Sequence, residues 1–127
     1  MNIVVCVKYV PDAQSERTFQ DSDSTVDRAG VDGLLSELDE YAVEEALKIV
    51  EAAGEGEVTV LTVGPAAAAD AIKKSLQMGA HAGVHVLDDA IHGSDAAATS
   101  LVLAEAVKKA TDGAPGLVLT GMTSTDG

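Results

Sequence analysis

Aromatic and basic residues are scarce in this chain. Its 127 residues include no Trp, one Phe and two Tyr, although 46% of them are hydrophobic. The core is therefore expected to be aliphatic, and stacking of bases on aromatic rings is not an expected mode of recognition.

Basic residues are few as well: eight Lys and Arg stand against 21 Asp and Glu, which gives a net charge of −13. This balance argues against a nucleic acid or an anionic membrane surface as a partner. It favours plain solubility, with an acidic docking face for a basic partner as the alternative.

Cysteine is also nearly absent. Cys6 is the single one, so the chain has no intrachain disulfide and no multi-cysteine metal site. No run reaches the roughly 18 apolar residues of a membrane span. The N-terminus lacks the basic, apolar and small-residue pattern of a signal peptide. We therefore expect one soluble, cytoplasmic domain with no direct membrane insertion.

Strand-like and helix-like segments alternate along the chain. Short, continuous apolar runs rich in β-branched residues predict buried parallel strands at 2–7, 57–63, 83–87 and 117–120. Apolar residues at helical spacing predict helices over 36–53, 65–78 and 94–110. Ser36 or Asp39 is expected to cap the first helix, and Ser94 the third. The expected buried positions of the third helix are Ala97, Leu101, Val102, Ala104 and Val107. Those of the second helix are Ala68, Ala69, Ile72 and Leu76.

The polar segment 13–35 interrupts this alternation. No helical or strand period holds there for long, and a short hairpin with residues 25–28 in one arm is the best interpretation. Pro11 cannot donate to a strand ladder, so the chain is expected to leave the sheet before this segment. Loops of this length in a compact domain are often functional.

The alternation predicts a doubly wound, mostly parallel α/β fold with helices on both faces, similar to a Rossmann fold. In the commonest arrangement the strands, numbered along the chain, lie in the order 3-2-1-4. Ligands of such sheets bind outside the carboxyl ends of the strands, where the winding reverses between strands one and four. The residues expected there are 6–8, 63–64 and 121–127.

The loop 121–127 follows the fourth strand and consists mainly of Gly, Thr and Ser. Backbone N–H groups of such a loop can face a phosphate. The loop matches neither G-x-x-x-x-G-K-[ST] nor G-x-G-x-x-G. No nucleophile adjoins a base, and the His spacing does not suit a metal, so no catalytic or metal-binding residues are expected. Because the sequence stops inside this loop, we expect 1–127 to be the N-terminal part of a single nucleotide-binding domain whose remainder is absent.

Five segments, in the same order, resemble the β subunit of electron transfer flavoprotein. They are VVCVKYVPD at 4–12, DEYAVEEAL at 39–47, VTVLTVGP at 58–65, AIKKSLQMGA at 71–80, and LVLTG at 117–121 with DG at 126–127. Each segment alone is common among α/β proteins, and the five together are specific. The resemblance covers the whole chain and corresponds to the N-terminal half of that family's longer chains. It also implies the three-layer α/β/α arrangement of adenine nucleotide α-hydrolase-like domains.

The resemblance implies a non-catalytic electron carrier. The β subunit of that family forms a heterodimer with an α subunit that holds most of the FAD site, and it buries a structural AMP. Electrons pass from flavin dehydrogenases, such as the acyl-CoA dehydrogenases of fatty acid β-oxidation, to electron transfer flavoprotein-quinone oxidoreductase. Carried over to this sequence, the nucleotide contacts are Cys6, Ser36, Glu37, Leu38, Asp39, Val63, Gly121, Met122, Thr123, Ser124, Thr125, Asp126 and Gly127.

The sequence departs from the family pattern at three places. The family often has Asn-Pro-Phe where this chain has 36–38, Lys-Gln where it has 122–123, and Asp in place of His81. Loss of the Lys removes a charge near the phosphate but leaves the backbone donors. Two other functions remain open: a stand-alone nucleotide-binding or stress-type α/β protein, and an enzyme of the adenine-nucleotide hydrolase type. The missing phosphate-chemistry motif disfavours the enzyme.

Overall fold

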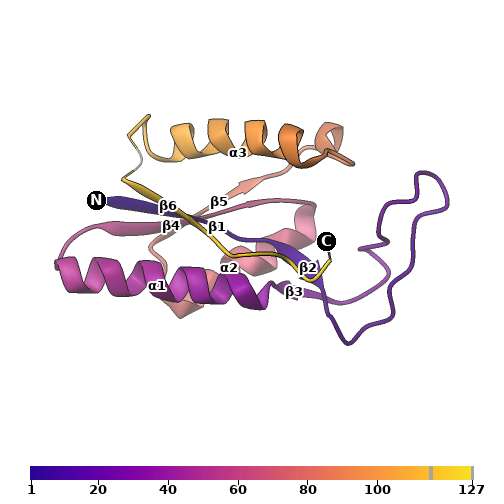
Figure 1. Ribbon diagram of the computed structural model, residues 1–127, viewed down its shortest axis with the longest axis horizontal. Coiled ribbons are helices and arrows are strands. Elements are labelled where there is room, and N and C mark those ends of the chain that lie inside the picture. Colours follow the sequence, from indigo (N-terminus) through magenta and orange to yellow (C-terminus); the bar gives the residue numbers. More distant parts are fainter. Residues whose placement is uncertain (115, 127) are drawn as a thin grey trace.

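A parallel four-stranded sheet forms the middle layer of the molecule (Figure 1). The computed structural model describes residues 1–114 and 116–126. Its strands are β1 (Asn2–Cys6), β4 (Glu57–Val63), β5 (Ala82–Val86) and β6 (Leu117–Thr120). They lie in the order β5-β4-β1-β6, and every adjacent pair is parallel. This confirms the predicted strand order and places the reversal of the winding between β1 and β6.

Helices cover both faces of the sheet, which confirms the predicted doubly wound, three-layer fold (Figure 1). On one face lie α1 (Glu37–Ala53) and α2 (Ala69–Met78), and on the other lies α3 (Ala96–Ala110). Short 3₁₀ turns, η1 (Ala66–Ala68) and η2 (Asp89–Ile91), precede α2 and α3. Gly54 ends α1 with a left-handed backbone, φ 73°, and its N–H donates to the carbonyls of the last turn.

The larger hydrophobic core lies under α1 and α2. Its buried members are all aliphatic: Ile3, Val5, Val7, Leu35, Ala42, Val43, Ala46, Val58, Val60, Ala71 and Ala80. Beneath α3 the buried cluster is smaller and consists of Val4, Leu61, Ala106 and Val107. Successive residues of β1 point to opposite faces of the sheet, so the run of valines supplies both cores.

A second, two-stranded ribbon was not predicted. In it β2 (Tyr9–Pro11) pairs antiparallel with β3 (Gly33–Leu35). The chain does leave the main sheet as predicted, and Pro11 occupies the last position of β2, where its missing N–H does little harm. Between the two strands, Phe19 pairs with Val26 in an isolated bridge, which confirms the short hairpin. The polar segment 12–32, here called the excursion, projects from this ribbon (Figure 1).

The predicted N-cap of α3 was wrong, and its predicted buried face is confirmed only in part. Asp95, rather than Ser94, is the N-cap, and its carboxylate accepts a hydrogen bond of 2.8 Å from the Ala98 N–H. Val107 is buried, as predicted, but Leu101 is 72% exposed, and the buried Ala106 was not predicted. Ala97 and Ala104 are exposed as well. A helix with apolar residues on all sides does not reveal from its period which side faces the sheet.

The predicted buried face of α2 is also confirmed only in part: Ala68, directly before the helix, is fully buried and Ile72 packs against the core, as predicted. Leu76 is 42% exposed, whereas Ala71 and Ser75 are fully buried. The Ser75 hydroxyl donates a 2.9 Å hydrogen bond to the Ala71 carbonyl, so this buried polar group has its partner within its own helix. A small hydroxyl residue can therefore lie against the sheet where sequence reasoning expected a leucine.

Candidate functional site

The carboxyl ends of β1 and β6 lie side by side. Cys6 is the register partner of Thr120, so the residues that follow the two strands emerge together at one edge of the sheet. Val63 ends β4 at the same edge and pairs with Val86 of β5. The predicted switch point is therefore present, and the loop 121–126 begins there.

Asp39 joins this edge to the first turn of α1. Its Oδ2 accepts a 2.7 Å hydrogen bond from the backbone N–H of Lys8, directly after β1. The carboxylate also accepts from the backbone N–H of Gly121, directly after β6. A Cβ on Gly121 would overlap the Asp39 carboxylate, so only glycine allows this approach. The structure thus brings together the segments 36–39 and 121–126, which the sequence had assigned to one site.

Burial is the main influence on the ionisation of Asp39. It raises the pKa of this carboxyl, and the hydrogen bonds from the Lys8 and Gly121 N–H groups partly oppose the rise. Burial, and then the nearby Asp39 carboxylate, also raise the pKa of the Cys6 thiol. Because only the thiolate is a good nucleophile, Cys6 is suited to packing at the strand tip rather than to covalent chemistry.

Ser36 occupies the N-cap position of α1, as predicted, but does not cap it. Its side chain makes no capping hydrogen bond, and its backbone N–H donates to the Lys8 carbonyl at 2.9 Å. Within the described residues its buried Oγ has no hydrogen-bond partner, and neither has the buried Oγ1 of Thr62 on β4. An unsatisfied buried hydroxyl costs about 1–3 kcal/mol, and it commonly marks the place of a ligand or an ordered water. Sequence reasoning missed Thr62; a hydroxyl beside the predicted Val63 was the available signal.

The far end of the loop is held by ion pairs. The side chain of Asp126 is fully buried, and its Oδ1 accepts a 2.8 Å hydrogen bond from Lys8 Nζ. Its Oδ2 accepts from the guanidinium of Arg28. Burial acts to raise the pKa of Asp126, but hydrogen bonds from Lys8, Ser124 and Arg28 outweigh it and lower the pKa to about 2. Asp126 is therefore an anion at any ordinary pH.

The excursion lies along this loop. Arg17 donates a 2.6 Å hydrogen bond to the Thr125 carbonyl, and Arg28 pairs with Asp126 as described. At the hairpin, Asp23 Oδ2 lies 3.0 Å from Nε2 of His92, in the loop before α3. Both arginines of the chain thus contact the predicted ligand loop from a segment distant in sequence. Sequence reasoning did not assign either one to the site, although two arginines within one polar segment of an acidic chain were a usable signal.

The remaining predicted site residues are less constrained. Glu37 and Thr123 are exposed, Leu38 is half-buried, and Met122 is 88% exposed. Gly127 lies outside the described residues. The Met122 side chain in particular points to solvent, so any contribution from this position to a ligand must come from its backbone.

The three histidines have structural partners rather than a shared site. His81 Nδ1 accepts a 3.0 Å hydrogen bond from the Val58 N–H, and His85 Nε2 lies 3.0 Å from the Gly64 carbonyl. Among the residues that the structure describes, no group of three or more His, Cys, Asp or Glu could hold a metal ion. Nor is any helix in that part of the chain long and apolar enough to cross a membrane.

A small hollow lies between the excursion, the ribbon β2–β3 and Thr125 of the loop. A hollow of about 80 Å³ beside the loop is lined by Val10, Asp12, Ala13, Gln14, Leu34, Glu37 and Thr125. Ligand pockets generally exceed about 300 Å³. Its charged lining residues are Asp12 and Glu37, so this hollow does not suit a phosphate.

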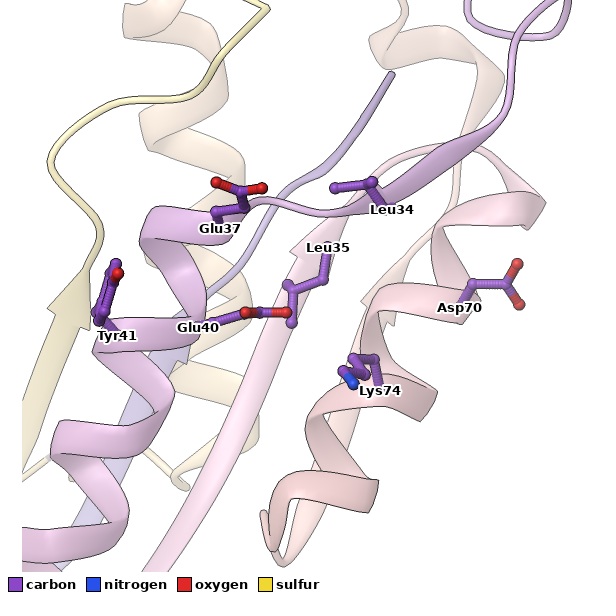
Figure 2. Close-up of a pocket in the computed structure, with 7 residues that line it drawn as sticks. All are labelled: Leu34, Leu35, Glu37, Glu40, Tyr41, Asp70 and Lys74. Carbon is purple, nitrogen blue, oxygen red and sulfur yellow. The ribbon is translucent and has the colours of Figure 1, made fainter. Parts of the chain in front are cut away.

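A larger groove of about 460 Å³ lies away from the switch point (Figure 2). Figure 2 shows it between the first turns of α1, strand β3 and α2. It is lined by Leu34, Leu35, Glu37, Glu40, Tyr41, Asp70 and Lys74. Three carboxylates and one ammonium group surround it, which makes it unsuited to a phosphate.

The parallel sheet, the polar loop at its switch point and the helix that begins beside that loop define an α/β domain with a candidate ligand site at the sheet edge. Residues 23–127 match the family described as the electron transfer flavoprotein domain. The chain belongs to this electron transfer flavoprotein family.

Curated relatives match over nearly the whole chain. It is 50% identical to the electron transfer flavoprotein subunit beta of Mycobacterium bovis over 99% of this chain and 48% of that protein. The corresponding protein of Mycobacterium leprae is 49% identical with the same coverage. Protein FixA of Rhizobium meliloti is 43% identical over 100% of this chain and 44% of its own length. The chain therefore spans about half the length of the curated relatives that it matches.

Proposed function

We propose that the chain forms the N-terminal half of an electron transfer flavoprotein β subunit and has no catalytic residues of its own. The mycobacterial relatives that carry this name support the proposal. In this role it pairs with an α subunit that holds most of the FAD. The flavin supplies the redox chemistry, and the protein supplies its position and surroundings. Flavin dehydrogenases, such as acyl-CoA dehydrogenases, donate electrons, and electron transfer flavoprotein-quinone oxidoreductase accepts them.

A structural AMP belongs to the same proposal, with its site at the tips of β1 and β6. The observation that carries it is the Asp39 carboxylate, which accepts from the N–H groups of both Lys8 and Gly121. Three segments that the resemblance assigns to the nucleotide therefore meet at one point. The unsatisfied Ser36 hydroxyl beside them offers a hydrogen bond to a ligand. A nucleotide here would act by filling the crevice and tying the loops together.

The charges give the nucleotide an orientation. Glu37, Asp39 and Glu40 all lie in the first turn of α1 and cancel the attraction of that helix end for a phosphate. The adenosine part is therefore assigned to the α1 side, near Ser36. The phosphate is assigned to the far end of the loop, where Lys8 and Arg28 converge.

Co-expression with an electron transfer flavoprotein α subunit tests this function. We expect a stable heterodimer with the absorbance of bound FAD, and AMP in the nucleotide fraction extracted from it. A second FAD in place of AMP would overturn only the nucleotide assignment. Failure to form a complex, with AMP still bound to the isolated chain, would favour the second candidate, a stand-alone nucleotide-binding protein of the same fold. As a matched control, Leu101→Ser alters an exposed residue of α3 and should leave the extracted nucleotide unchanged.

A further inference from the structure

The larger groove, between α1, β3 and α2, combines an apolar floor with a mostly acidic rim. It is here called the acidic groove, and its lining residues are Leu34, Leu35, Glu37, Glu40, Tyr41, Asp70 and Lys74. Leu35 is 4% exposed and belongs to the core under α1 and α2, and Leu34 beside it is half-buried. The volume of about 460 Å³ is within the range of pockets that hold a ligand. The groove therefore brings the surface close to the hydrophobic core.

The charges of the acidic groove are unbalanced and unpaired. Three carboxylates line it and only one ammonium group, that of Lys74. Figure 2 shows the side chains of Glu40 and Lys74 extending from α1 and α2 into the space between the two helices. None of the ion pairs in the described part of the chain includes any of these four charged side chains. The excess negative charge is therefore available to a cation from outside.

Helix geometry explains part of this charge. Glu37 and Glu40 stand in the first turn of α1 and Asp70 in that of α2, where the helix dipole favours a carboxylate. The dipole does not explain the apolar floor, nor why Tyr41, one of only three aromatic residues in the chain, is 73% exposed. Tyrosine is enriched at protein interfaces because it offers a large apolar face with one polar end. These features together are typical of a docking surface.

Arginine has the side chain that matches this surface. Its apolar stem can lie along the two leucines of the floor while its charged head remains near the rim. The planar guanidinium forms bidentate hydrogen bonds with carboxylates, and Glu40 is the carboxylate that extends into the groove (Figure 2). Apolar residues beside the arginine would fill the rest of the volume and contact Tyr41.

A second copy of this chain is a poor occupant. Each copy has a net charge of −13, so two copies repel each other. The chain has basic side chains to offer, but Arg17 and Arg28 both donate hydrogen bonds within their own chain. Charge complementarity therefore favours a different protein with a basic segment.

We propose that the acidic groove docks a basic segment of a partner protein, with an arginine of that segment on Glu40 and its apolar neighbours on the leucines of β3. This goes beyond the proposed function, because the groove lies away from the tips of β1 and β6. Lys74 opposes the arginine, and it sets a limit on the affinity.

Fluorescence anisotropy of a labelled peptide, measured with the full natural chain, tests the docking. The probe has one arginine between two leucines, and its reference has citrulline, which has a similar shape and no charge. The reference should bind about tenfold more weakly. Glu40→Gln should weaken the arginine peptide about threefold, and Lys74→Gln should tighten it about twofold. Glu51→Gln, an equal charge change at an exposed position about 16 Å further along α1, is the matched control and should change binding by less than about 1.5-fold.

The opposite signs of the two groove variants decide the matter. Equal weakening by Glu40→Gln and Glu51→Gln would mean that the overall negative charge holds the peptide. Weaker binding in Lys74→Gln with tighter binding in Glu40→Gln would mean that the groove prefers an acidic segment. Equal affinity for the citrulline peptide would exclude recognition of the guanidinium. Each of these results overturns the proposal, as does a dissociation constant above about 1 mM.

Two further measurements separate the occupants. If arginine amide displaces the peptide as effectively as the unlabelled peptide does, the groove is a site for a small cation and the proposal is wrong. If sedimentation shows a dimer that Glu40→Gln dissociates, a second copy occupies the groove instead. A monomeric chain from which arginine amide displaces the peptide only at far higher concentration supports the docking of a partner segment.

Discussion

The two ends of the loop 121–126 are held by opposite kinds of contact. At its start, Gly121 donates a backbone N–H to the Asp39 carboxylate and lies against α1. At its end, the Asp126 carboxylate accepts from the side chains of Lys8 and Arg28. The first contact joins a backbone group to the first turn of α1, and the second joins a buried carboxylate to two partly exposed basic side chains.

The difference shows in the two carboxylates. Burial raises the pKa of Asp39, whose donors are neutral backbone groups, whereas cationic donors and Ser124 lower the pKa of Asp126 to about 2. Asp39 is thus held by close packing and by hydrogen bonds from neutral backbone groups. Asp126 is held by ion pairs with basic side chains. We infer that the start of the loop is a fixed anchor and that its end is the part that can exchange partners.

The largest effect is expected for Gly121→Ala, which breaks the fixed anchor. A Cβ at this position overlaps the Asp39 carboxylate, so either the loop or α1 must shift. Overpacking of this kind costs up to about 3 kcal/mol of unfolding free energy. Urea denaturation followed by circular dichroism measures it. Met122→Ala, at the exposed next residue, is the control and should change stability by less than about 0.5 kcal/mol. An equally stable Gly121→Ala protein would show that the anchor is not tight.

A smaller loss is expected for Asp39→Asn. The amide can accept from only one of the two N–H groups through its oxygen, so the Lys8 or the Gly121 N–H loses its partner. An unsatisfied buried donor costs about 2 kcal/mol. Glu40→Gln, a matched change in the same turn of α1, should cost less than about 0.5 kcal/mol. Equal losses in the two variants, measured by the same denaturation, would assign the effect to the charge of the helix end instead.

The fixed anchor was largely predictable from the sequence. Four short β-branched runs alternating with helical patterns define the strand order, and the order defines which tips meet. Asp39 and Gly121 follow from that geometry because each stands at the end of an element. The buried side of α3 was predicted only at Val107, since alanines and leucines surround that helix and its period does not select a face.

The exchangeable end was not predictable. Nothing in the sequence pairs Arg28 with Asp126, because charged residues do not specify a partner 98 positions away. The excursion has no regular period, so its path over the loop depends on tertiary contacts alone. The small hollow beside Thr125 is lined partly by residues of the excursion, so sequence reasoning had no means to anticipate it.

Acid titration compares the two ends directly. The folded pKa of Asp126 lies below its ordinary value, so its contribution to stability is complete above pH about 4 and is lost as the pH falls through about 2. The folded pKa of Asp39 lies above its ordinary value, so its ionised form costs stability, and protonation on acidification relieves that cost. Both effects are expected to be smaller than those of the substitutions above, because solvent screens the partly exposed partners of Asp126.

Unfolding free energies of wild type, Asp126→Asn and Asp39→Asn between pH 2 and about 7 measure these contributions. The advantage of wild type over Asp126→Asn should shrink below pH about 4. The difference between wild type and Asp39→Asn should move in the opposite direction as the pH falls. If both differences shrink together, the two carboxylates are held in the same way, and the contrast between the ends of the loop is wrong.

The smallest effect is expected for Arg17→Gln, at the outer side of the exchangeable end. Arg17 donates to the Thr125 carbonyl, an exposed contact with no charged partner. An exposed interaction of this kind is worth less than about 1 kcal/mol and is weakened by salt when charge contributes. The change should be detected by hydrogen exchange and not by global stability. The backbone amides in the loop 121–126 should exchange faster, with little change elsewhere. The Gly121 amide, bound to Asp39, should be the least affected of them. Uniform acceleration from Gly121 to Asp126 would show that the loop opens as one unit, which is incompatible with a fixed start and an exchangeable end.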